Sequence, residues 1–336
     1  MKAAIWYGGK DIRIEKVPLP KIKDDEVLVK IQAVSICGSD LHAYLGVSKR
    51  RIPPLVMGHE FSGEIVKLGK KVKNLSEGER VVVEPIVSCG TCLLCKGGRN
   101  NICQNLQLVG LHLSGAFSEY VAVPAKKCYV LSKTVSFEEA SLVEPLAVAV
   151  HAVNLASLEK NEAVAIIGSG AIGLMTLQVV KEKGVREIYC LDTLEYRLAV
   201  ARKLGATTTI NVTKEEPVQK ILAEGGVDTV FEAVGHQQTV QQALAMVKKG
   251  GTVIVIGMLE ALMQLPMLDI TIKEIELHGS YGYTSDDFQQ ALNLLMKKKV
   301  NVIPLITHLL PLENIQHGFE ILSLGAENVI KVVLTP

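Results

Sequence analysis

The order of hydrophobic and polar positions changes character along this chain of 336 residues. In roughly the first 130 residues, apolar positions come in short alternating runs bounded by glycine, proline or charge, for example at 26–34, 63–69 and 80–86. Alternation with a period of two is typical of half-buried antiparallel strands. The pattern therefore predicts a first domain rich in short strands.

A helical stretch is expected at 136–157. Ser136 is followed three residues later by Glu139, which is the spacing of a capping box at a helix N-terminus. The chain is about twice as long as a usual domain. A helix at this point would therefore link two domains.

Beyond residue 162, strand-like runs alternate with helix-like segments. The runs lie at 162–168, 187–192, 207–212, 227–235, 251–257 and 274–280. This βαβ alternation predicts a parallel, doubly wound sheet and places the protein in the α/β class.

The end of the chain is predicted to return to the first domain. Amphipathic helices are expected at 285–298 and 313–323, followed by a strand at 331–334. This strand lies far along the chain from its expected neighbours. We therefore expect it to pair with strands of the β-rich first domain. The predicted domains are therefore 1–145 and 146–282, with 283–336 returning to the first.

Charge and hydropathy exclude several classes of partner. Lysine and arginine number 36 against 35 acidic residues, so a net charge of +1 creates no global field toward nucleic acid or an anionic membrane. The N-terminus reaches charged residues before an apolar signal region could form, and no uninterrupted apolar stretch approaches a membrane span in length. We expect a globular, cytoplasmic protein that binds neither nucleic acid nor membrane.

A glycine-rich motif opens the second domain. Residues 164–173 read VAIIGSGAIG, so a buried strand runs into Gly168, Gly170 and Gly173 and a helix follows. Such glycines allow a tight turn, close approach of backbone to a pyrophosphate and close helix packing, while the helix N-terminus attracts the anion. The next strand ends in Asp192, whose carboxylate can accept hydrogen bonds from ribose hydroxyls and would repel a 2′-phosphate.

These residues predict an NAD site rather than an NADP site. The expected cofactor contacts are Gly168, Gly170, Ala171, Ile172, Gly173, Asp192 and Arg197. Arg197 could soften the preference for NAD, although a solvated helix position is its simpler explanation. The alternative is that these glycines serve only to make a tightly packed turn. That alternative does not account for the strand before the motif, the helix after it and Asp192 at the end of the next strand.

Four of the seven cysteines fall within fifteen residues, in a glycine-rich loop with the spacing C-x2-C-x2-C-x7-C. The four are Cys89, Cys92, Cys95 and Cys103. Thiolates at this spacing can close a tetrahedron around Zn²⁺ with no open position, which predicts a structural zinc site. An iron–sulfur cluster could use the same ligands, and a nucleic-acid-binding zinc ribbon would need more positive charge than Lys96 and Arg99 supply.

A second set of candidate metal ligands is spread more widely. Cys37 lies in CGSDLH, His59 and Glu60 lie in GHEFSGE, and Glu144 lies in EPLAVAVH. Thiolate, imidazole and carboxylate all bind zinc, and three protein ligands leave the open position that a catalytic zinc requires. By spacing alone, a surface turn and a core thiol would also explain these residues.

Taken in order, CGSDLH, GHEFSGEIVKLG, the four-cysteine loop, EPLAVAVHA and GSGAIG resemble the zinc-containing medium-chain dehydrogenase/reductase family over essentially the whole chain. Within that family the sequence is most similar to the polyol (sorbitol) and 2,3-butanediol dehydrogenases. The resemblance implies a GroES-like catalytic domain interrupted by a Rossmann domain, with the active site in the cleft between them. It also implies two zinc ions per chain, one catalytic and one structural, and NAD as cofactor.

The resemblance also implies roles for the second set of ligands. Cys37 and His59 match ligands of the catalytic zinc, and Glu60 matches the position that binds this zinc in the polyol branch. Glu144 matches a glutamate beside the metal that binds it directly or through water.

Three further residues match a proton relay. Ser39 matches the hydroxyl that takes the substrate proton, His42 the group that passes it to solvent, and Asp40 the carboxylate that orients His59. Without the resemblance, ordinary polarity at a turn or helix start would explain all three.

The implied reaction is the reversible oxidation of a secondary alcohol, such as a polyol or vicinal diol, to the ketone. One alternative is an L-threonine 3-dehydrogenase, although EPIVSCG and EPLAVAVH depart from the pattern of those enzymes. Another is a catalytically silent nucleotide-binding protein, which would be expected to lack ligands that are all present here. The resemblance also implies a homodimer or homotetramer built across Rossmann sheet edges.

Overall fold

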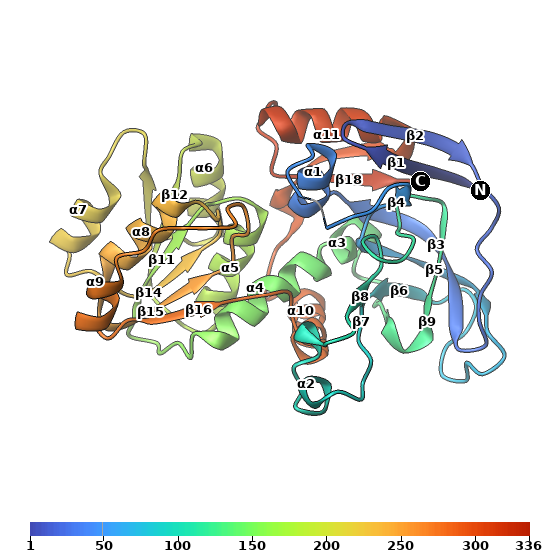
Figure 1. Ribbon diagram of the computed structural model, residues 1–336, viewed down its shortest axis with the longest axis horizontal. Helices are drawn as coiled ribbons and strands as arrows, with labels where there is room; N and C mark the ends of the chain where they lie inside the picture. The colour runs from blue at the N-terminus through green and yellow to red at the C-terminus, as the bar shows by residue number, and fades with distance from the viewer. Residues whose placement is uncertain (49) are drawn as a thin grey trace. The chain divides into compact units, whose positions relative to one another are not determined.

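The computed structural model describes residues 1–48 and 50–336, which form two compact units (Figure 1). Unit 1 comprises Met1–Glu144, Thr284–Lys297 and Val302–Pro336. Unit 2 comprises Pro145–Tyr283 and Lys298–Asn301. The short segment 298–301 therefore packs with unit 2, although the residues on both sides of it belong to unit 1.

The main sheet of unit 1 is built from the short alternating runs. Its strands are β3 (Glu26–Ser35), β5 (Glu60–Leu68), β6 (Arg80–Val83), β9 (Tyr120–Pro124), β10 (Cys128–Val130), β17 (Ile306–Pro311) and β18 (Lys331–Thr335). Their order is β10-β6-β5-β3-β18-β17, with β9 also pairing with β3. Only β17 and β18 pair in parallel within this described sheet. Strand β18, from the end of the chain, thus lies beside β3, from the beginning of the chain.

Smaller sheets and short helices complete unit 1. The remaining strands are β1 (Lys2–Gly8), β2 (Asp11–Lys16), β4 (Leu55–Val56), β7 (Ile86–Val87) and β8 (Gln107–Leu108). The helices are α1 (Gly38–Tyr44), α2 (Leu93–Lys96), α3 (Phe137–Ser141), α10 (Ser285–Met296) and α11 (Ile315–Leu324), with 3₁₀ turns η1 (Asn100–Ile102), η2 (Ala125–Lys127), η3 (Ile303–Leu305) and η4 (Leu312–Asn314). The core includes a stacked pair, Tyr44 and Phe319, with ring centroids 4.6 Å apart.

The stretch expected to form one helix at 136–157 forms two. The capping box is present, because Ser136 Oγ accepts the Glu139 N–H at 3.1 Å and the Glu139 carboxylate accepts the Ser136 N–H at 3.0 Å. Helix α3 nevertheless ends at Ser141, and α4 (Val143–Leu155) begins after a break. Pro145 explains the restart, since proline lacks an N–H and is tolerated only in the first turn of a helix.

Unit 2 holds the parallel sheet. Its strands are β11 (Ala163–Ile167), β12 (Glu187–Asp192), β13 (Thr208–Asn211), β14 (Val227–Glu232), β15 (Val247–Val255) and β16 (Glu276–Gly279), in the order β13-β12-β11-β14-β15-β16. The helices after α4 are α5 (Ala171–Glu182), α6 (Glu195–Leu204), α7 (Pro217–Ala223), α8 (Gln237–Met246) and α9 (Met267–Ile272). The strand order reverses direction between β11 and β14, as in nucleotide-binding Rossmann sheets.

The α/β class and the pairing of a β-rich domain with a Rossmann-type domain are confirmed by these elements. Strand β11 is buried along its whole length, as expected for the centre of a parallel sheet. Within the described residues, no helix is both long enough and apolar enough to cross a membrane.

Candidate functional site

The first candidate metal site lies at one end of the β3 and β5 pair in unit 1. β3 ends at Ser35 and β5 begins at Glu60, and the antiparallel register places these two residues opposite each other. Cys37 follows β3 and is the N-cap of α1, while His59 directly precedes β5. Strand pairing thus brings Cys37, His59 and Glu60 together although they are distant in sequence.

Cys37, His59 and Glu60 form a buried cluster of donors. One ligand atom from each, a sulfur, a nitrogen and a carboxylate oxygen, lies within 4.8 Å of the other two. His59 and Glu60 are only 4% and 1% exposed. His59 Nδ1 faces Asp40, which leaves Nε2 for a metal. A thiolate, an imidazole and a carboxylate grouped in this way fit a zinc ion with an open position.

Asp40, in the first turn of α1, links this cluster to the surrounding structure. It is fully buried, its Oδ2 accepts the Cys37 N–H at 3.1 Å, and its Oδ1 lies 3.5 Å from His59 Nδ1. Burial favours the neutral acid, but the charges of His59 and Arg51 hold the pKa of Asp40 below its usual value. Burial also opposes a charged His59, yet Asp40 and Cys37 raise the pKa of His59 well above its usual value. The cluster therefore attracts positive charge.

Glu60 is also held by a buried lysine from the other end of the chain. Lys331, at the start of β18, places Nζ 2.6 Å from Glu60 Oε2 and 2.8 Å from Oε1. Ser35 Oγ donates a hydrogen bond to the same carboxylate. Burial works against the charge of Lys331, but Glu60 and Cys37 outweigh it and raise the pKa of this lysine. The ammonium group thus offsets part of the negative charge of the cluster.

Glu144 lies near this site without belonging to the three-residue cluster. It stands in the first turn of α4, is 7% exposed and contributes to the raised pKa of Lys331 through its charge. Its charge therefore acts on the Glu60–Lys331 pair.

Ser39 and His42 lie on α1, between Cys37 and the end of that helix. Ser39 Oγ accepts a hydrogen bond from Arg51 Nη2 at 3.2 Å. His42 is partly buried, and burial together with the charge of Arg51 lowers its pKa below the usual value. A neutral imidazole at neutral pH is suited to accept a proton.

The four clustered cysteines meet in the loop around α2 and η1. Cys103 Sγ lies 3.4 Å from Cys89 Sγ and 4.0 Å from Cys92 Sγ, and Cys89 Sγ lies 3.9 Å from Cys95 Sγ. Four sulfurs on a tetrahedron around zinc, with Zn–S of about 2.3 Å, would stand about 3.8 Å apart. Backbone N–H groups of Thr91 and Cys92 lower the pKa of Cys89 to about 5. The sulfurs thus fit a closed zinc site.

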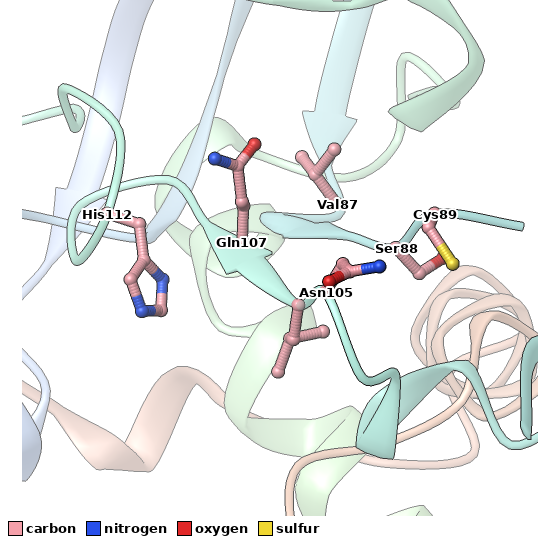
Figure 2. Close-up of a pocket in the computed structure, with 7 residues that line it drawn as sticks. Val87, Ser88, Cys89, Asn105, Gln107 and His112 are labelled. Atoms are coloured by element: carbon pink, nitrogen blue, oxygen red, sulfur yellow. The ribbon is translucent and has the colours of Figure 1, made fainter. Parts of the chain in front are cut away.

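An open depression of about 510 Å³ adjoins this loop (Figure 2). It is lined by Val87, Ser88, Cys89, Asn105, Leu106, Gln107 and His112. Figure 2 shows the Cys89 sulfur at one end of this lining and the His112 ring at the other. The lining contains no member of the Cys37 cluster, so this hollow is separate from the candidate catalytic site.

The glycine motif of unit 2 has the geometry that its sequence predicts. Gly168 has φ of +92°, and a Cβ at Gly173 would stand 1.8 Å from the Gly168 carbonyl oxygen, so no side chain fits there. Gly170 is the N-cap of α5, which begins with Ala171 and Ile172.

Asp192 is tied to this loop. Its Oδ2 accepts the Ser169 N–H at 2.8 Å and its Oδ1 accepts the Leu194 N–H at 2.9 Å. Arg197 Nη1 lies 3.8 Å from Asp192 Oδ2 and 3.9 Å from the position of a Cβ at Gly170. Arg197 is therefore beside the glycine loop and not simply on a solvated helix face.

Two charged residues of the site were not predicted from the sequence. Lys331 opens the apolar run KVVL, where a lysine inside a core strand is a signal that its charge needs a partner. Arg51 lies in the basic segment SKRRIPP, and nothing distinguishes it there from its neighbours. Both are revealed only by their buried partners, Glu60 and Asp40.

Comparison with known proteins agrees with this architecture. Residues 23–133 match the family model described as alcohol dehydrogenase GroES-like domain, and residues 171–297 match the model described as zinc-binding dehydrogenase. An L-threonine 3-dehydrogenase from Bacillus licheniformis is 39% identical over 100% of this chain and 99% of its own. A sorbitol dehydrogenase from Bacillus subtilis is 35% identical over 100% of this chain and 97% of its own.

Solved structures are similar over the same length. The 2R,3R-butanediol dehydrogenase from Bacillus subtilis has a TM-score of 0.92 and 33% identity, covering 100% of this chain and 99% of its own. A putative zinc-binding dehydrogenase from Sinorhizobium meliloti 1021, bound to NADP, has a TM-score of 0.94 and 31% identity, with coverage of 100% and 99%. With the two family models and these full-length relatives, the chain belongs to the zinc-containing medium-chain dehydrogenase/reductase family of alcohol dehydrogenases.

Proposed function

We propose that this dehydrogenase uses NAD to oxidise a secondary alcohol with a second hydroxyl on the neighbouring carbon, reversibly, to the ketone. Polyols and vicinal diols, such as sorbitol and 2,3-butanediol, are the proposed substrates. The observation that carries the proposal is the buried cluster of Cys37, His59 and Glu60, with the carboxylate of Glu144 close to it. This site holds one thiol and two carboxylates, which offer acceptors for a second hydroxyl.

The metal sites are proposed to be two. Cys37, His59 and Glu60 would hold a catalytic zinc, with Glu144 binding it directly or through water, and the four-cysteine loop would hold a structural one. When bound, the catalytic zinc supplies Lewis-acid polarisation of the substrate hydroxyl.

The chain's own residues handle the proton. Asp40, whose Oδ1 lies 3.5 Å from His59 Nδ1, would orient the imidazole with Nε2 available to a metal. Ser39 Oγ takes the proton from the substrate hydroxyl. His42, whose pKa is lowered, is neutral at pH 7 and passes a proton to solvent.

Asp192 supports NAD as the preferred cofactor. Its carboxylate is held by two backbone N–H groups at the edge of the glycine loop, where a 2′-phosphate would meet its negative charge. Arg197 opposes this effect because its guanidinium lies beside the same carboxylate. We expect kcat/KM for NAD to exceed that for NADP by about tenfold, roughly 1.4 kcal/mol. Equal values for the two cofactors would show that Arg197 cancels the charge of Asp192.

The charges at the site favour a neutral substrate. Arg51 and Lys331 are both buried and already paired, with Asp40 and Glu60 respectively, so neither is available to bind a substrate carboxylate. A diol can donate its second hydroxyl to a carboxylate of the site, and a hydrogen bond to a charged group contributes about 1.5–3 kcal/mol that a simple alcohol lacks. Diols should therefore be preferred over ethanol and 1-butanol by roughly ten- to hundredfold in kcat/KM.

The test is NAD reduction with a panel of polyols, 2,3-butanediol isomers, L-threonine and simple primary alcohols. The proposal expects the highest kcat/KM among the polyols and diols. If a primary alcohol is oxidised as efficiently as every diol and polyol, the proposed substrate class is wrong.

L-Threonine is the second candidate substrate, because relatives named L-threonine 3-dehydrogenase reach 39% identity. Its reacting group is also a secondary alcohol with a polar neighbour. Threonine would bring a carboxylate and an ammonium group to a site rich in carboxylates. A kcat/KM for threonine above that of every polyol would replace the first candidate by the second.

We also propose that the protein is a homo-oligomer paired through unit 2. Strand β16 is the edge strand of its sheet, and Leu277 on it is partly exposed. Nearby in sequence, α9 exposes Met267, Leu268 and Ile272 by 61%, 71% and 64%. An open strand edge and exposed large apolar side chains are each costly in water. Light scattering that gives the mass of one chain at micromolar concentration would contradict this proposal.

A further inference from the structure

Arg51 is buried beside the candidate catalytic site and donates four hydrogen bonds. Nη1 donates to the Ser39 carbonyl oxygen at 2.8 Å, and Nε donates to the Gly110 carbonyl oxygen at 3.1 Å. Nη2 donates to Asp40 Oδ1 at 2.6 Å and to Ser39 Oγ at 3.2 Å. One guanidinium group thus holds two residues of the implied proton relay and the backbone of a separate loop.

The contact with Ser39 constrains the direction of proton transfer. A serine hydroxyl has one proton and two acceptor lone pairs. Because Arg51 has no acceptor, it always occupies one lone pair of Ser39 Oγ, and the hydroxyl proton must point elsewhere. One lone pair then remains to take a proton, while the original hydroxyl proton leaves in another direction and the hydroxyl is restored.

The contact with Asp40 affects His59. Arg51 and His59 approach the same carboxylate oxygen, Oδ1, at 2.6 Å and 3.5 Å respectively. A carboxylate that accepts the N–H of a ligating histidine makes the imidazole more basic and strengthens its hold on a metal. Arg51 makes the shorter, charged hydrogen bond to Oδ1. Asp40 therefore raises the basicity of His59 less than it would without Arg51.

We propose that Arg51 is a positioning residue that orients Ser39, so that its hydroxyl keeps one acceptor and one donor direction for proton transfer, and that it limits the pull of Asp40 on His59. This inference rests on the proposed function in its first part, since Ser39 must handle a substrate proton. Its second part concerns only the metal cluster. A residue needed merely to neutralise Asp40 would require a positive charge, but not the contacts with Ser39.

The experiment compares Arg51→Gln and Arg51→Lys with Arg50→Gln, which removes the same charge from the exposed neighbouring residue. Rates are expressed per zinc-loaded site, so that a poorly folded fraction does not count. We expect kcat of Arg51→Gln to fall by roughly 10²-fold with little change in KM, and its solvent deuterium isotope effect to rise because proton transfer becomes slow. Arg51→Lys keeps the positive charge but lacks the planar guanidinium group with its several fixed donors. Its kcat should therefore lie between those of Arg51→Gln and the wild type.

Metal affinity is measured on the same variants by competition with a chromophoric chelator, without substrate or NAD. We expect Arg51→Gln to bind the zinc of the Cys37 cluster about three- to tenfold more tightly than Arg50→Gln, because Asp40 is then left to His59. Arg51→Lys should bind it as the wild type does. The four-cysteine loop serves as an internal reference in each protein.

These readouts separate the two hypotheses. If wild type oxidises no alcohol, the proposed function fails, whereas tighter zinc binding in Arg51→Gln still supports the sharing of Asp40. If wild type is active and Arg51→Gln matches Arg50→Gln in kcat, isotope effect and zinc affinity, the role assigned to Arg51 is wrong. A lower melting temperature with all three values unchanged would likewise overturn it, because it shows a purely structural role.

Discussion

The two candidate metal sites of unit 1 are built in opposite ways. The four-cysteine loop draws all its donors from one short segment, and three of its cysteines are partly exposed. The Cys37 cluster draws on α1 and β5, is stabilised by Lys331 from β18, and holds its histidine and glutamate in the core. A local site can be closed by backbone turns alone, whereas a dispersed site requires the sheet to form first.

This difference in construction matches a difference in chemistry. Four thiolates leave no open position and fit a metal that stabilises a loop. A mixed set with surrounding charges, such as Asp40, Arg51 and Lys331, allows the reactivity of the metal and the path of a proton to be tuned. The comparison predicts that damage to the Cys37 cluster lowers mainly the catalytic rate, whereas damage to the four-cysteine loop lowers mainly the free energy of unfolding.

The largest effect is expected from His59→Ala. Loss of a ligand from the Cys37 cluster should lower kcat at least about 10³-fold, which corresponds to roughly 4 kcal/mol of barrier. The fold should remain, since the strands β3 and β5 pair through backbone hydrogen bonds. Steady-state kinetics and circular dichroism measure the two quantities. A variant that keeps wild-type kcat would remove His59 from the active site.

Cys92→Ala is the matching change in the other site. Loss of one thiolate should release the loop metal and lower the free energy of unfolding by about 4 kcal/mol, with local unfolding of the loop. Activity per folded molecule should stay within about threefold of wild type. Denaturant unfolding and metal analysis check this outcome. Equal loss of rate and of fold in Cys92→Ala and His59→Ala would abolish the distinction between the sites.

Two buried lysine–glutamate pairs allow a sharper comparison. Lys331–Glu60 lies in the Cys37 cluster, and Lys127–Glu84 lies away from it, with N–O distances of 2.6 Å in both. Removing one partner of a buried pair costs about 3–5 kcal/mol, so Lys331→Met and Lys127→Met should both lower the free energy of unfolding by about that amount. Only Lys331→Met should change the zinc affinity of the Cys37 cluster.

Chelator competition on the two lysine variants decides this point. If Lys127→Met changes the affinity of the Cys37 cluster as much as Lys331→Met does, the effect is a general loosening of unit 1. In that case the Glu60–Lys331 pair has no specific role at the metal.

What could be predicted from sequence follows the same division between local and dispersed features. The cysteine loop, the glycine motif and the capping box at Ser136 each lie within a few consecutive residues, and the structure gives them the expected geometry. The α/β class followed from the periodicity of the strands. Pro145 is visible in the sequence and is a signal for a new helix start, yet the helix break before it was not predicted.

The supporting charges could not be predicted in this way. Arg51 meets Asp40 from a segment without regular structure, and Lys331 meets Glu60 only because β18 pairs with β3. Each contact depends on strand order and register, which a single sequence leaves open. The assignment of Cys37, His59 and Glu60 required the family resemblance, since a surface turn and a core thiol would also explain their spacing.

The smallest effect is expected from a pair of histidines, one beside each metal site. His42 is partly buried, and burial and the charge of Arg51 lower its pKa below 6.5, so it stays neutral until the pH falls below that value. A base works only while unprotonated, and kcat/KM should therefore fall on the acid side through this lowered pKa. His42→Gln should reduce kcat/KM at pH 8 by roughly tenfold and remove that limb of the profile. His112→Gln, which changes an exposed imidazole in the depression beside Cys89, should leave the profile as in wild type. A profile that keeps its acid limb in His42→Gln would show that another group of the Cys37 cluster limits the rate, and the comparison between the two regions would then rest on metal and fold alone.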